Sequence, residues 1–360
     1  MILNLILICL IAAVFSAVAF YSSCKWAKPL GLVHTPHLDR HLHKTSIPLT
    51  GGVVLFLVLL LIATPFAFWI TELSDNFLYA VIGASILFIS GIIDDIKHTS
   101  PVTRLIIQIA AASLLVVGGD IYVHSLGSIW SSNEILLGDW SKIFTIAAIV
   151  TAINAFNMID GIDGLASGLA MIVLGAILYL NLSNQNSFFV ISLIMVSSLI
   201  IFFVFNLGIF NSRRKIFLGD SGSTLLGFIC AWFLIESSSQ SDQTLPPIAV
   251  VFILLVPILD IFSVMFARLL NGLSPFKADQ NHIHHLMLMF GLSHRKTLVV
   301  ILILATFFAW IGIYHQTLGI SERILFIAFM FMFILKLVII YITIRFRKKL
   351  QVNKPKKSTA

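Results

Sequence analysis

Long apolar runs dominate this chain, and no other feature constrains its fold as strongly. Each run approaches the roughly 20 residues that a helix needs to cross the hydrocarbon core of a bilayer. Eleven runs are found, near residues 2–23, 49–70, 77–93, 104–118, 142–156, 164–181, 188–206, 221–236, 247–267, 296–315 and 323–344. They lack the alternation typical of membrane β-barrels, so we expect an all-α polytopic membrane bundle of about eleven transmembrane helices.

The composition agrees with a protein dissolved in lipid. Hydrophobic residues make up 59% of the chain and charged residues 11%, whereas charged residues are about 25% of an average soluble domain. A soluble globular domain, a disordered chain and a disulfide scaffold are therefore excluded. We expect one membrane domain over residues 1–344 and a basic cytoplasmic tail over residues 345–360.

The basic residues indicate how the bundle is oriented. Twenty of the 23 Lys and Arg residues fall on one side of the predicted spans. Loops rich in Lys and Arg stay in the cytoplasm, so an odd number of spans places the N-terminus outside and the C-terminus inside. Because orientation accounts for these cations, the net charge of +7 does not indicate a nucleic-acid binder.

An acidic pair ends the third apolar run on the same side. Asp94 and Asp95 are adjacent, so their carboxylates repel each other, and the dipole at a helix C-terminus disfavours anions as well. A bound divalent cation would remove both penalties. In the alternative, Lys97 and His98 neutralise the pair in a solvated loop.

A polar stretch interrupts the apolar sequence between the fifth and sixth runs. It carries Asn154, Asn157, Asp160 and Asp163, and the Gly161 backbone allows a close approach of other groups. An N-cap of the sixth helix by Asp163 would explain only one of these polar side chains. We therefore predict a binding site here.

A glycine-rich turn opens the eighth run, with Phe217, Asp220 and Ser221 in it. The free N–H groups and dipole of a helix N-terminus favour phosphate, although a simple N-cap is the alternative. Inside the ninth run, Asp260 is an acid at membrane depth, which is costly and therefore indicates a function. It could equally lie at the mouth of a Pro-kinked helix.

The longest loop on the cytoplasmic side carries His282, His284 and His285, which follow Arg268. Three histidines can bind zinc, but no cysteine accompanies them. We expect them to donate hydrogen bonds to phosphate or sugar oxygens instead, with a solvated basic loop as the alternative. Lys44, in the first loop on this side, is a further candidate phosphate contact.

Together these residues indicate phosphoryl transfer at a membrane surface. A hard divalent cation, Mg²⁺ or alternatively Mn²⁺, binds carboxylates and takes phosphate oxygens as its other ligands. The cations around it attract a polyanionic soluble substrate, and the setting indicates a lipid as the second substrate. Positioning and charge neutralisation carry most of the catalysis in such reactions.

Four motifs in this order resemble the polyprenyl-phosphate N-acetylhexosamine-1-phosphate transferase family. They are Asp94-Asp95, residues 154–166, residues 217–223 and residues 282–285, and the resemblance extends from Lys44 to His285. The resemblance implies that UDP-N-acetylhexosamine and polyprenyl phosphate react to polyprenyl-diphosphate-sugar and UMP, with Mg²⁺. It also implies a bacterial inner membrane and an active site facing the cytoplasm.

Two details resemble one branch of this family. Ile283 interrupts the histidine run, and a basic insert at residues 213–215 lengthens the stretch from Asn206 to Asp220. Both are similar to enzymes that transfer N-acetylglucosamine 1-phosphate from UDP-GlcNAc to undecaprenyl phosphate and so initiate O-antigen, common-antigen or related polysaccharides. Another UDP-N-acetylhexosamine donor and phospho-MurNAc-pentapeptide transfer remain alternatives within the family.

The resemblance also implies residue roles. Asp220 and Asp95 would bind the metal ion, and Asp94 would take the proton from the polyprenyl phosphate or help bind the metal. The substrate-binding set would be Lys44, Asn157, Asp160, Gly161, Asp163, Phe217, Arg268, His282, His284 and His285. Outside this class, an ion-coupled transporter is the alternative, but the sequence shows none of the repeats common in transporters. A second copy of the chain is a candidate partner.

Overall fold

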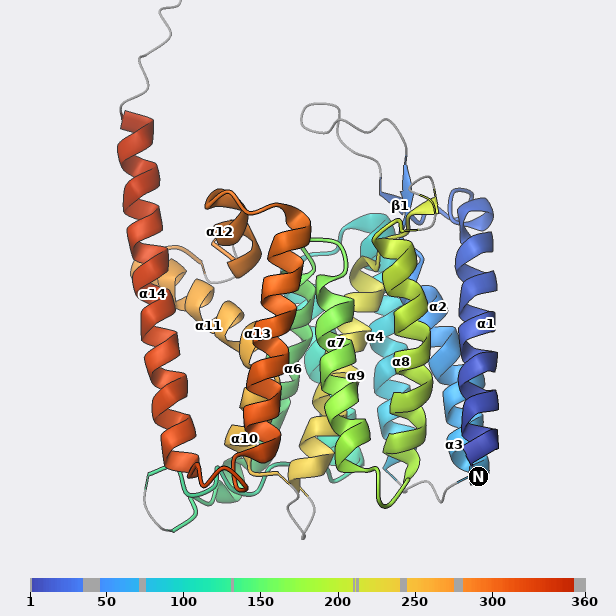
Figure 1. Ribbon diagram of the computed structural model, residues 1–360, viewed down its shortest axis with the longest axis horizontal. Helices are drawn as coiled ribbons and strands as arrows, with labels where there is room; N and C mark the ends of the chain where they lie inside the picture. The colour runs from blue at the N-terminus through green and yellow to red at the C-terminus, as the bar shows by residue number, and fades with distance from the viewer. Residues whose placement is uncertain are drawn as a thin grey trace, which may run out of the picture.

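The computed structural model describes residues 2–34, 46–70, 76–130, 133–209, 211, 214–239, 245–274 and 281–352. These residues form a bundle that is almost entirely helical, which confirms the predicted fold class (Figure 1). The α-helices are α1 (Ile2–Trp26), α2 (Gly51–Val58), α3 (Thr64–Ile70), α4 (Phe77–Lys97), α5 (Pro101–Ser113), α6 (Ser141–Ile159), α7 (Leu165–Leu180), α8 (Ser187–Asn206), α9 (Gly219–Ser239), α10 (Pro247–Ile253), α11 (Leu255–Leu270), α12 (Ile283–Met289), α13 (His294–Tyr314) and α14 (Glu322–Val352).

Short elements complete the fold. A π-helical turn, η1 (Leu59–Ala63), joins α2 to α3, and a second one, η2 (Leu114–Gly118), extends α5. A 3₁₀ turn, η3 (Gly138–Trp140), leads into α6. Two strands of two residues, β1 (Val33–His34) and β2 (Ile47–Pro48), pair antiparallel at one end of the bundle.

The predicted number of eleven spans is not confirmed, although each predicted run is helical. Among the described residues, eight helices are long and apolar enough to cross a membrane, and the bent pair α10–α11 would make nine. The apolar helix α7 is short, with 16 residues. The helix α9 is not one of the eight.

The helix α9 lies inside the bundle, and its polar residues are concentrated at its two ends. It packs against α6, α4, α2 and α7 (Figure 1), and nearly all of its residues are buried, including Ser221, Ser223 and Glu236. Because its neighbours are protein rather than lipid, it does not need an apolar surface all round. The apolar run predicted over residues 221–236 is therefore a helix buried within the protein.

Two glycines bring α2 and α4 into backbone contact with the start of α9. A Cβ atom on Gly91 of α4 would overlap the backbone of Ser221, and one on Gly52 of α2 would overlap the backbone of Gly222. Small residues permit this close approach of membrane helices. The end of α4, which carries the acidic pair, is thereby fixed beside the N-terminus of α9.

The ninth predicted run is broken. The axes of α10 and α11 differ by 90° across a break at Leu254. Pro257 explains its position, because a proline ring clashes with the carbonyl four residues earlier, here that of Ile253, and cannot donate to it. After the break, α11 runs obliquely across the bundle towards α14 (Figure 1).

The first and last helices place the ends of the described chain on opposite sides of the bundle. The start of α1 lies at the end opposite to β1 and α12, whereas α14 finishes at the same end as these elements (Figure 1). This agrees with an odd number of crossings. Which end faces the cytoplasm stays a prediction from the distribution of cations.

Candidate active site

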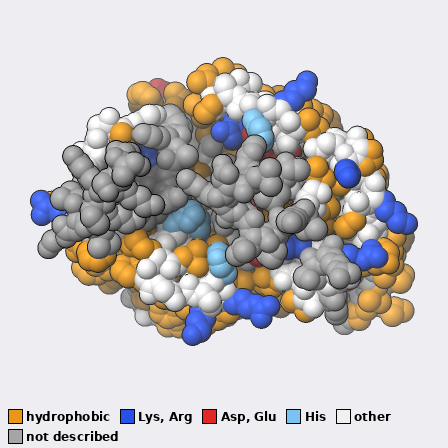
Figure 2. Space-filling model, turned by 90° about the horizontal axis from the view of Figure 1, so that it is seen from above, with side chains coloured by type: hydrophobic (Ala, Val, Ile, Leu, Met, Phe, Trp, Pro, Cys, Tyr) orange, Lys and Arg blue, Asp and Glu red, His pale blue; other side chains and the backbone are white. Residues whose placement is uncertain are grey.

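Two cavities lie at the end of the bundle that carries β1 and α12. Figure 2 looks onto this end and shows Lys and Arg side chains around the edge and His side chains in a central hollow. The first cavity, called the apolar cavity, has a volume of about 700 Å³ and lies between α4, α5, α6, α9, α11 and α12. The second, called the polar cavity, has a volume of about 450 Å³ and lies beside β1, Phe217 and the loop between α6 and α7.

Asp220 and Asn157 belong to the wall that the two cavities share, because both residues line each of them. Asn157 reaches Asp220 from the last turns of α6. Its Nδ2 donates to Asp220 Oδ1 at 2.7 Å and to Ser223 Oγ at 3.0 Å. The amide thus holds the Asp220 carboxylate at the point where the cavities meet.

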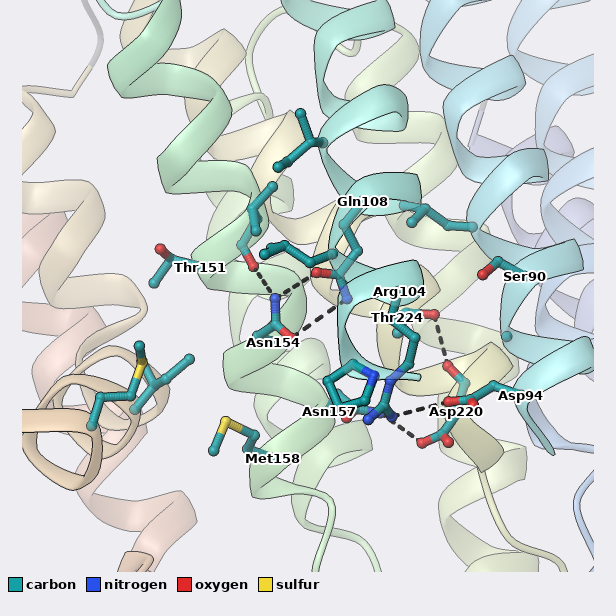
Figure 3. A pocket seen from close by; sticks show the side chains of 18 of the residues that line it. Ser90, Asp94, Arg104, Gln108, Thr151, Asn154, Asn157, Met158, Asp220 and Thr224 are labelled. Carbon is teal, nitrogen blue, oxygen red and sulfur yellow. Dashed lines mark hydrogen bonds and ion pairs between the residues drawn. The ribbon is translucent and has the colours of Figure 1, made fainter. Parts of the chain in front are cut away.

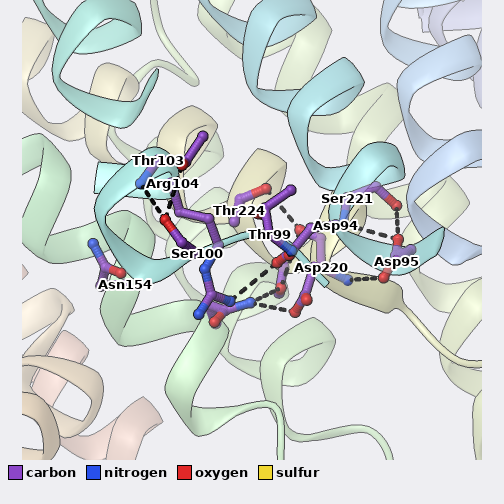
Figure 4. A network of polar contacts seen from close by, with 12 residues as sticks. Asp94, Asp95, Thr99, Ser100, Thr103, Arg104, Asn154, Asp220, Ser221 and Thr224 are labelled. Atoms are coloured by element: carbon purple, nitrogen blue, oxygen red, sulfur yellow. Dashed lines mark hydrogen bonds and ion pairs between the residues drawn. The ribbon is translucent and has the colours of Figure 1, made fainter. Parts of the chain in front are cut away.

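Asp94 faces Asp220 from the end of α4 (Figure 4). Its side chain is buried and accepts from Thr99 N at 2.6 Å and Thr99 Oγ1 at 2.7 Å. Arg104 forms an ion pair with it at 3.0 Å. The carboxyl groups of Asp94 and Asp220 also interact directly. Two donors of Thr99 and the guanidinium of Arg104 therefore hold Asp94 in one orientation at the shared wall.

Asp95 has a different task from its neighbour, since it caps α9. Its Oδ1 accepts from Asp220 N at 2.7 Å, and its Oδ2 accepts from Ser221 N at 3.2 Å and Ser221 Oγ at 2.8 Å (Figure 4). Gly219 has φ +77°, and a Cβ on it would lie 2.7 Å from Asp95 Oδ2. A carboxylate at a helix N-terminus satisfies free N–H groups and the dipole. In these contacts Asp95 positions Asp220.

The site has an excess of negative charge, which fits a cation. Asp160 lies within electrostatic range of Asp95, Asp163 and Asp220. Among the described residues, no group of three or more His, Cys, Asp or Glu side chains is already arranged as a metal site. Asp220 and the facing Asp94 nevertheless suit Mg²⁺, which binds one or two carboxylates and completes its shell with water and phosphate oxygens. The metal roles of Asp220 and Asp95 stay predictions.

The polar cavity combines an aromatic ring with charged groups. Phe217 is approached by the His34 ring at 5.9 Å and by Lys215 Nζ at 5.0 Å from its centroid. Lys215 also forms an ion pair with Asp163 at 2.5 Å. Asn206 joins this segment to the preceding loop, because it accepts from Gly164 N and donates to Ile216 O at 2.8 Å.

His284 packs against the backbone of Gly161. A Cβ atom on Gly161 would overlap His284 Nε2. The ring of His284 is 1% exposed, and neither of its nitrogens makes a hydrogen bond within the described part of the chain. Burial, with His285 nearby, lowers the pKa of His284 to about 3, so the ring is neutral at physiological pH, with one nitrogen a donor and the other an acceptor.

Away from the carboxylates, the walls of the apolar cavity are aliphatic. Ile109, Ile143 and Val150 line it. A single amide pair lies among them in Figure 3, where Asn154 Nδ2 donates to Gln108 Oε1 at 2.6 Å. The cavity therefore changes from charged at Asp94 and Asp220 to apolar between α5 and α6.

All predicted site residues that the structure describes line one of the two cavities. Lys44 lies outside the described residues. Arg104, Lys215 and Asn206 belong to the site but were not predicted from the sequence. A signal existed for each: Arg104 lies nine residues after Asp95, Lys215 belongs to the basic insert, and Asn206 is a polar residue at the end of an apolar run.

Comparisons with known proteins agree with this geometry. A family model described as "Glycosyl transferase family 4" matches residues 77–238. The chain is 34% identical to the undecaprenyl-phosphate alpha-N-acetylglucosaminyl 1-phosphate transferase of Escherichia coli O157:H7, over 89% of this chain and 87% of that protein. It is 34% identical to the transferase of the same name in Yersinia pestis, over 89% and 87%, and 35% identical to that of Pasteurella multocida, over 85% of each.

Proposed function

The chain belongs to glycosyl transferase family 4, and we propose that it transfers N-acetylglucosamine 1-phosphate from UDP-N-acetylglucosamine to undecaprenyl phosphate, with release of UMP. The names of its relatives support this donor sugar and this lipid. The alternatives, which are phospho-MurNAc-pentapeptide transfer and an ion-coupled transporter, are not favoured. In this proposal the protein works in a bacterial inner membrane and initiates a cell-envelope polysaccharide.

One observation carries the proposal: carboxylates lie where a polar and an apolar cavity meet. Asp220 lines both cavities, and Asp94 faces it. A nucleotide sugar suits the polar cavity, where Phe217 offers a face for the base, and an isoprenoid chain suits the aliphatic walls between α5 and α6. The reacting phosphates of the two substrates would then come together at Asp220.

The residues around this point have tasks that match phosphoryl transfer. Asp94, fixed by Thr99 and Arg104, would take the proton of the lipid phosphate. Asp220 would hold Mg²⁺ or Mn²⁺ with the help of Asp95 or Asp94, and the ion would supply neutralisation of the phosphate charge. No group of the protein has to form a covalent bond in this scheme, because positioning and electrostatics suffice.

The remaining predicted residues would bind the donor. Asn157, Asp160, Gly161 and Asp163 line the polar cavity and would contact the nucleotide. Arg268, His282, His284 and His285 line the apolar cavity near the carboxylates and would hold phosphates and sugar. Lys44 would add a phosphate contact.

The test uses the full chain purified in detergent with UDP-GlcNAc, undecaprenyl phosphate and Mg²⁺. The wild type should release UMP, and Asp220→Asn should lower the rate by on the order of a hundredfold to a thousandfold, as is typical of a lost electrostatic group at a reaction centre. Asp120→Asn is the matched control, because Asp120 is an exposed acid that pairs with Lys142 away from both cavities.

Near-wild-type UMP release by Asp220→Asn would remove Asp220 from the reaction. A panel of UDP-sugars competing with UDP-GlcNAc in the same assay decides the donor. Stronger competition by another N-acetylated sugar than by UDP-GlcNAc would overturn the assignment of the donor while leaving the reaction class intact.

A further inference from the structure

A buried ion pair lies behind the histidines of the apolar cavity, and the proposed chemistry does not use it. Asp260 of α11 is 1% exposed. Its Oδ1 accepts from Lys336 Nζ of α14 at 2.5 Å, and its Oδ2 contacts His282 Nδ1 at 2.6 Å. Oδ1 also accepts from Ile283 N at 2.7 Å. One carboxylate therefore connects α11, the start of α12 and α14.

The charges of this group make the role of each atom definite. Asp260 pairs with the ammonium group of Lys336, whose side chain is 12% exposed, so the carboxylate is ionised and can only accept hydrogen bonds. Nδ1 of His282 must then carry a proton and donate it to Asp260. Nε2 is the nitrogen that remains for a ligand, since the same ring lines the apolar cavity.

The contact also fixes the backbone that carries the histidines. Ile283 is the first residue of α12, and its N–H bonds the same carboxylate as the His282 ring. His284 and His285 follow on this helix, and their rings lie 4.2 Å apart between centroids. Through Asp260, the orientation of the His282 ring and the start of α12 are set together.

Within this ion-pair group, Lys336 is the residue whose burial in a membrane helix costs most free energy. A lysine in a membrane helix is expensive and almost always has a functional partner. The helix α14 packs on α11 and α10, and most of its surface faces outwards. A simple helix-to-helix contact could be made by apolar side chains at lower cost. Lys336 instead neutralises the one carboxylate that orients His282.

We propose that Asp260 and Lys336 are positioning residues for the transfer reaction, which hold His282 with Nε2 directed at the phosphates or sugar of the bound donor. This inference rests on the proposed function. Neither residue touches the substrate in it, and both act through His282. Both lie beyond residue 238, where the match to the family model ends.

The rival explanation is that the ion pair only fastens α14 to α11. A double-mutant cycle of Lys336→Met with His282→Ala separates the two, because residues that act through one another are not additive. Lys336→Met should lower kcat/KM by about tenfold to a hundredfold, the range typical when an outer residue that helps orient a metal-binding histidine is removed. In the His282→Ala background it should cause no further loss.

Steady-state constants supply a second readout. We expect Lys336→Met to change KM for UDP-GlcNAc or kcat while KM for undecaprenyl phosphate stays within twofold of the wild type. Lys336→Arg, which keeps the charge and a donor, should restore most of the activity. Lys142→Met is the control, since Lys142 forms an exposed ion pair with Asp120 and should leave kcat/KM unchanged.

Three outcomes would overturn the inference: a Lys336→Met enzyme within twofold of wild type, a loss that multiplies with that of His282→Ala, or equal changes in KM for both substrates. If Lys336→Met does not fold, Lys336→Gln, which keeps a donor to Asp260, replaces it under the same criteria. Failure of the proposed function is distinguishable, because the wild type itself would then release no UMP.

Discussion

At the scale of single residues, the absence of a side chain can be as important as its presence. Gly161 has no Cβ, and His284 occupies the space where one would be. This contact joins the loop after α6, which lines the polar cavity, to α12, which lines the apolar cavity. The contact between Gly161 and His284 therefore holds the loop after α6 against α12, and so the polar cavity beside the apolar cavity.

Gly161→Ala should displace His284 and lower the rate of UMP release at least tenfold, with little change in thermal stability. The reason is steric, because the added methyl group would overlap His284 Nε2. The rate is measured on the detergent-purified variant. Gly175→Ala, in α7, is the control: a Cβ there meets nothing within 4 Å. Equal rates for the two variants would refute the proposed role of the contact.

The kinds of residue in the site were predictable, whereas their partners were not. Polar groups at the ends of apolar runs identified Asp94 and Asp220, and the histidines of the longest predicted loop on that side identified His284. Which cation meets which acid depends on packing between distant segments. Arg104 therefore went unassigned although it binds Asp94, and Lys336 was overlooked inside an apolar run.

At the scale of elements, the N-terminus of α9 determines where the central carboxylate of the site lies. No side chain of its own provides the main cap. Asp95 of α4 does so, and the Gly91 contact brings α4 close enough. Since Asp220 lies in the first turn of α9, any shift of this terminus moves the central carboxylate.

Asp95→Ala should destabilise the protein by about 1–2 kcal/mol, the usual cost of a lost N-cap, and should also lower UMP release. Thermal unfolding in detergent measures the first effect. Asn186→Ala is matched to it, because Asn186 caps α8 through Phe189 N at 3.1 Å away from both cavities. It should cost similar stability and leave activity unchanged. An Asp95→Ala protein as stable as the wild type would contradict the capping role.

Helix positions were predictable because each apolar run forms a helix. The number of helices that cross the membrane was not predictable in the same way, because not every apolar helix is a separate span. The helix α9 is surrounded by protein and carries polar residues at both ends, and α7, with 16 residues, is too short to be counted on its own. Pro257 indicated a kink, and the 90° break lies at Leu254, one helical turn earlier. The direction that α11 takes afterwards depends on its packing with α6 and α14, which no local pattern contains.

At the scale of the whole molecule, both cavities lie at one end of the bundle. The helix α12 and the end of α14 share that end (Figure 1), and Asp94 and the three histidines line the apolar cavity there. The predicted orientation places this end in the cytoplasm, and that prediction follows from the cations alone.

The orientation is tested by cysteine labelling of intact and lysed spheroplasts. In a background with Cys9, Cys24 and Cys230 replaced, Asn184→Cys, in the α7–α8 loop, should react with a membrane-impermeant maleimide in spheroplasts. Ser358→Cys, in the basic tail, should react only after lysis. The reverse pattern would show that the site opens to the outside and would overturn the predicted orientation.

The break between α10 and α11 has a consequence for how the enzyme meets its acceptor. The oblique helix α11 lines the same cavity as Ile109 and Ile143, and these two side chains are exposed. An isoprenoid that enters there keeps its tail among acyl chains and withdraws only its head group from the interface. The encounter then takes place in two dimensions, so the rate should follow the surface density of acceptor, and added detergent should slow the purified enzyme simply by diluting that surface.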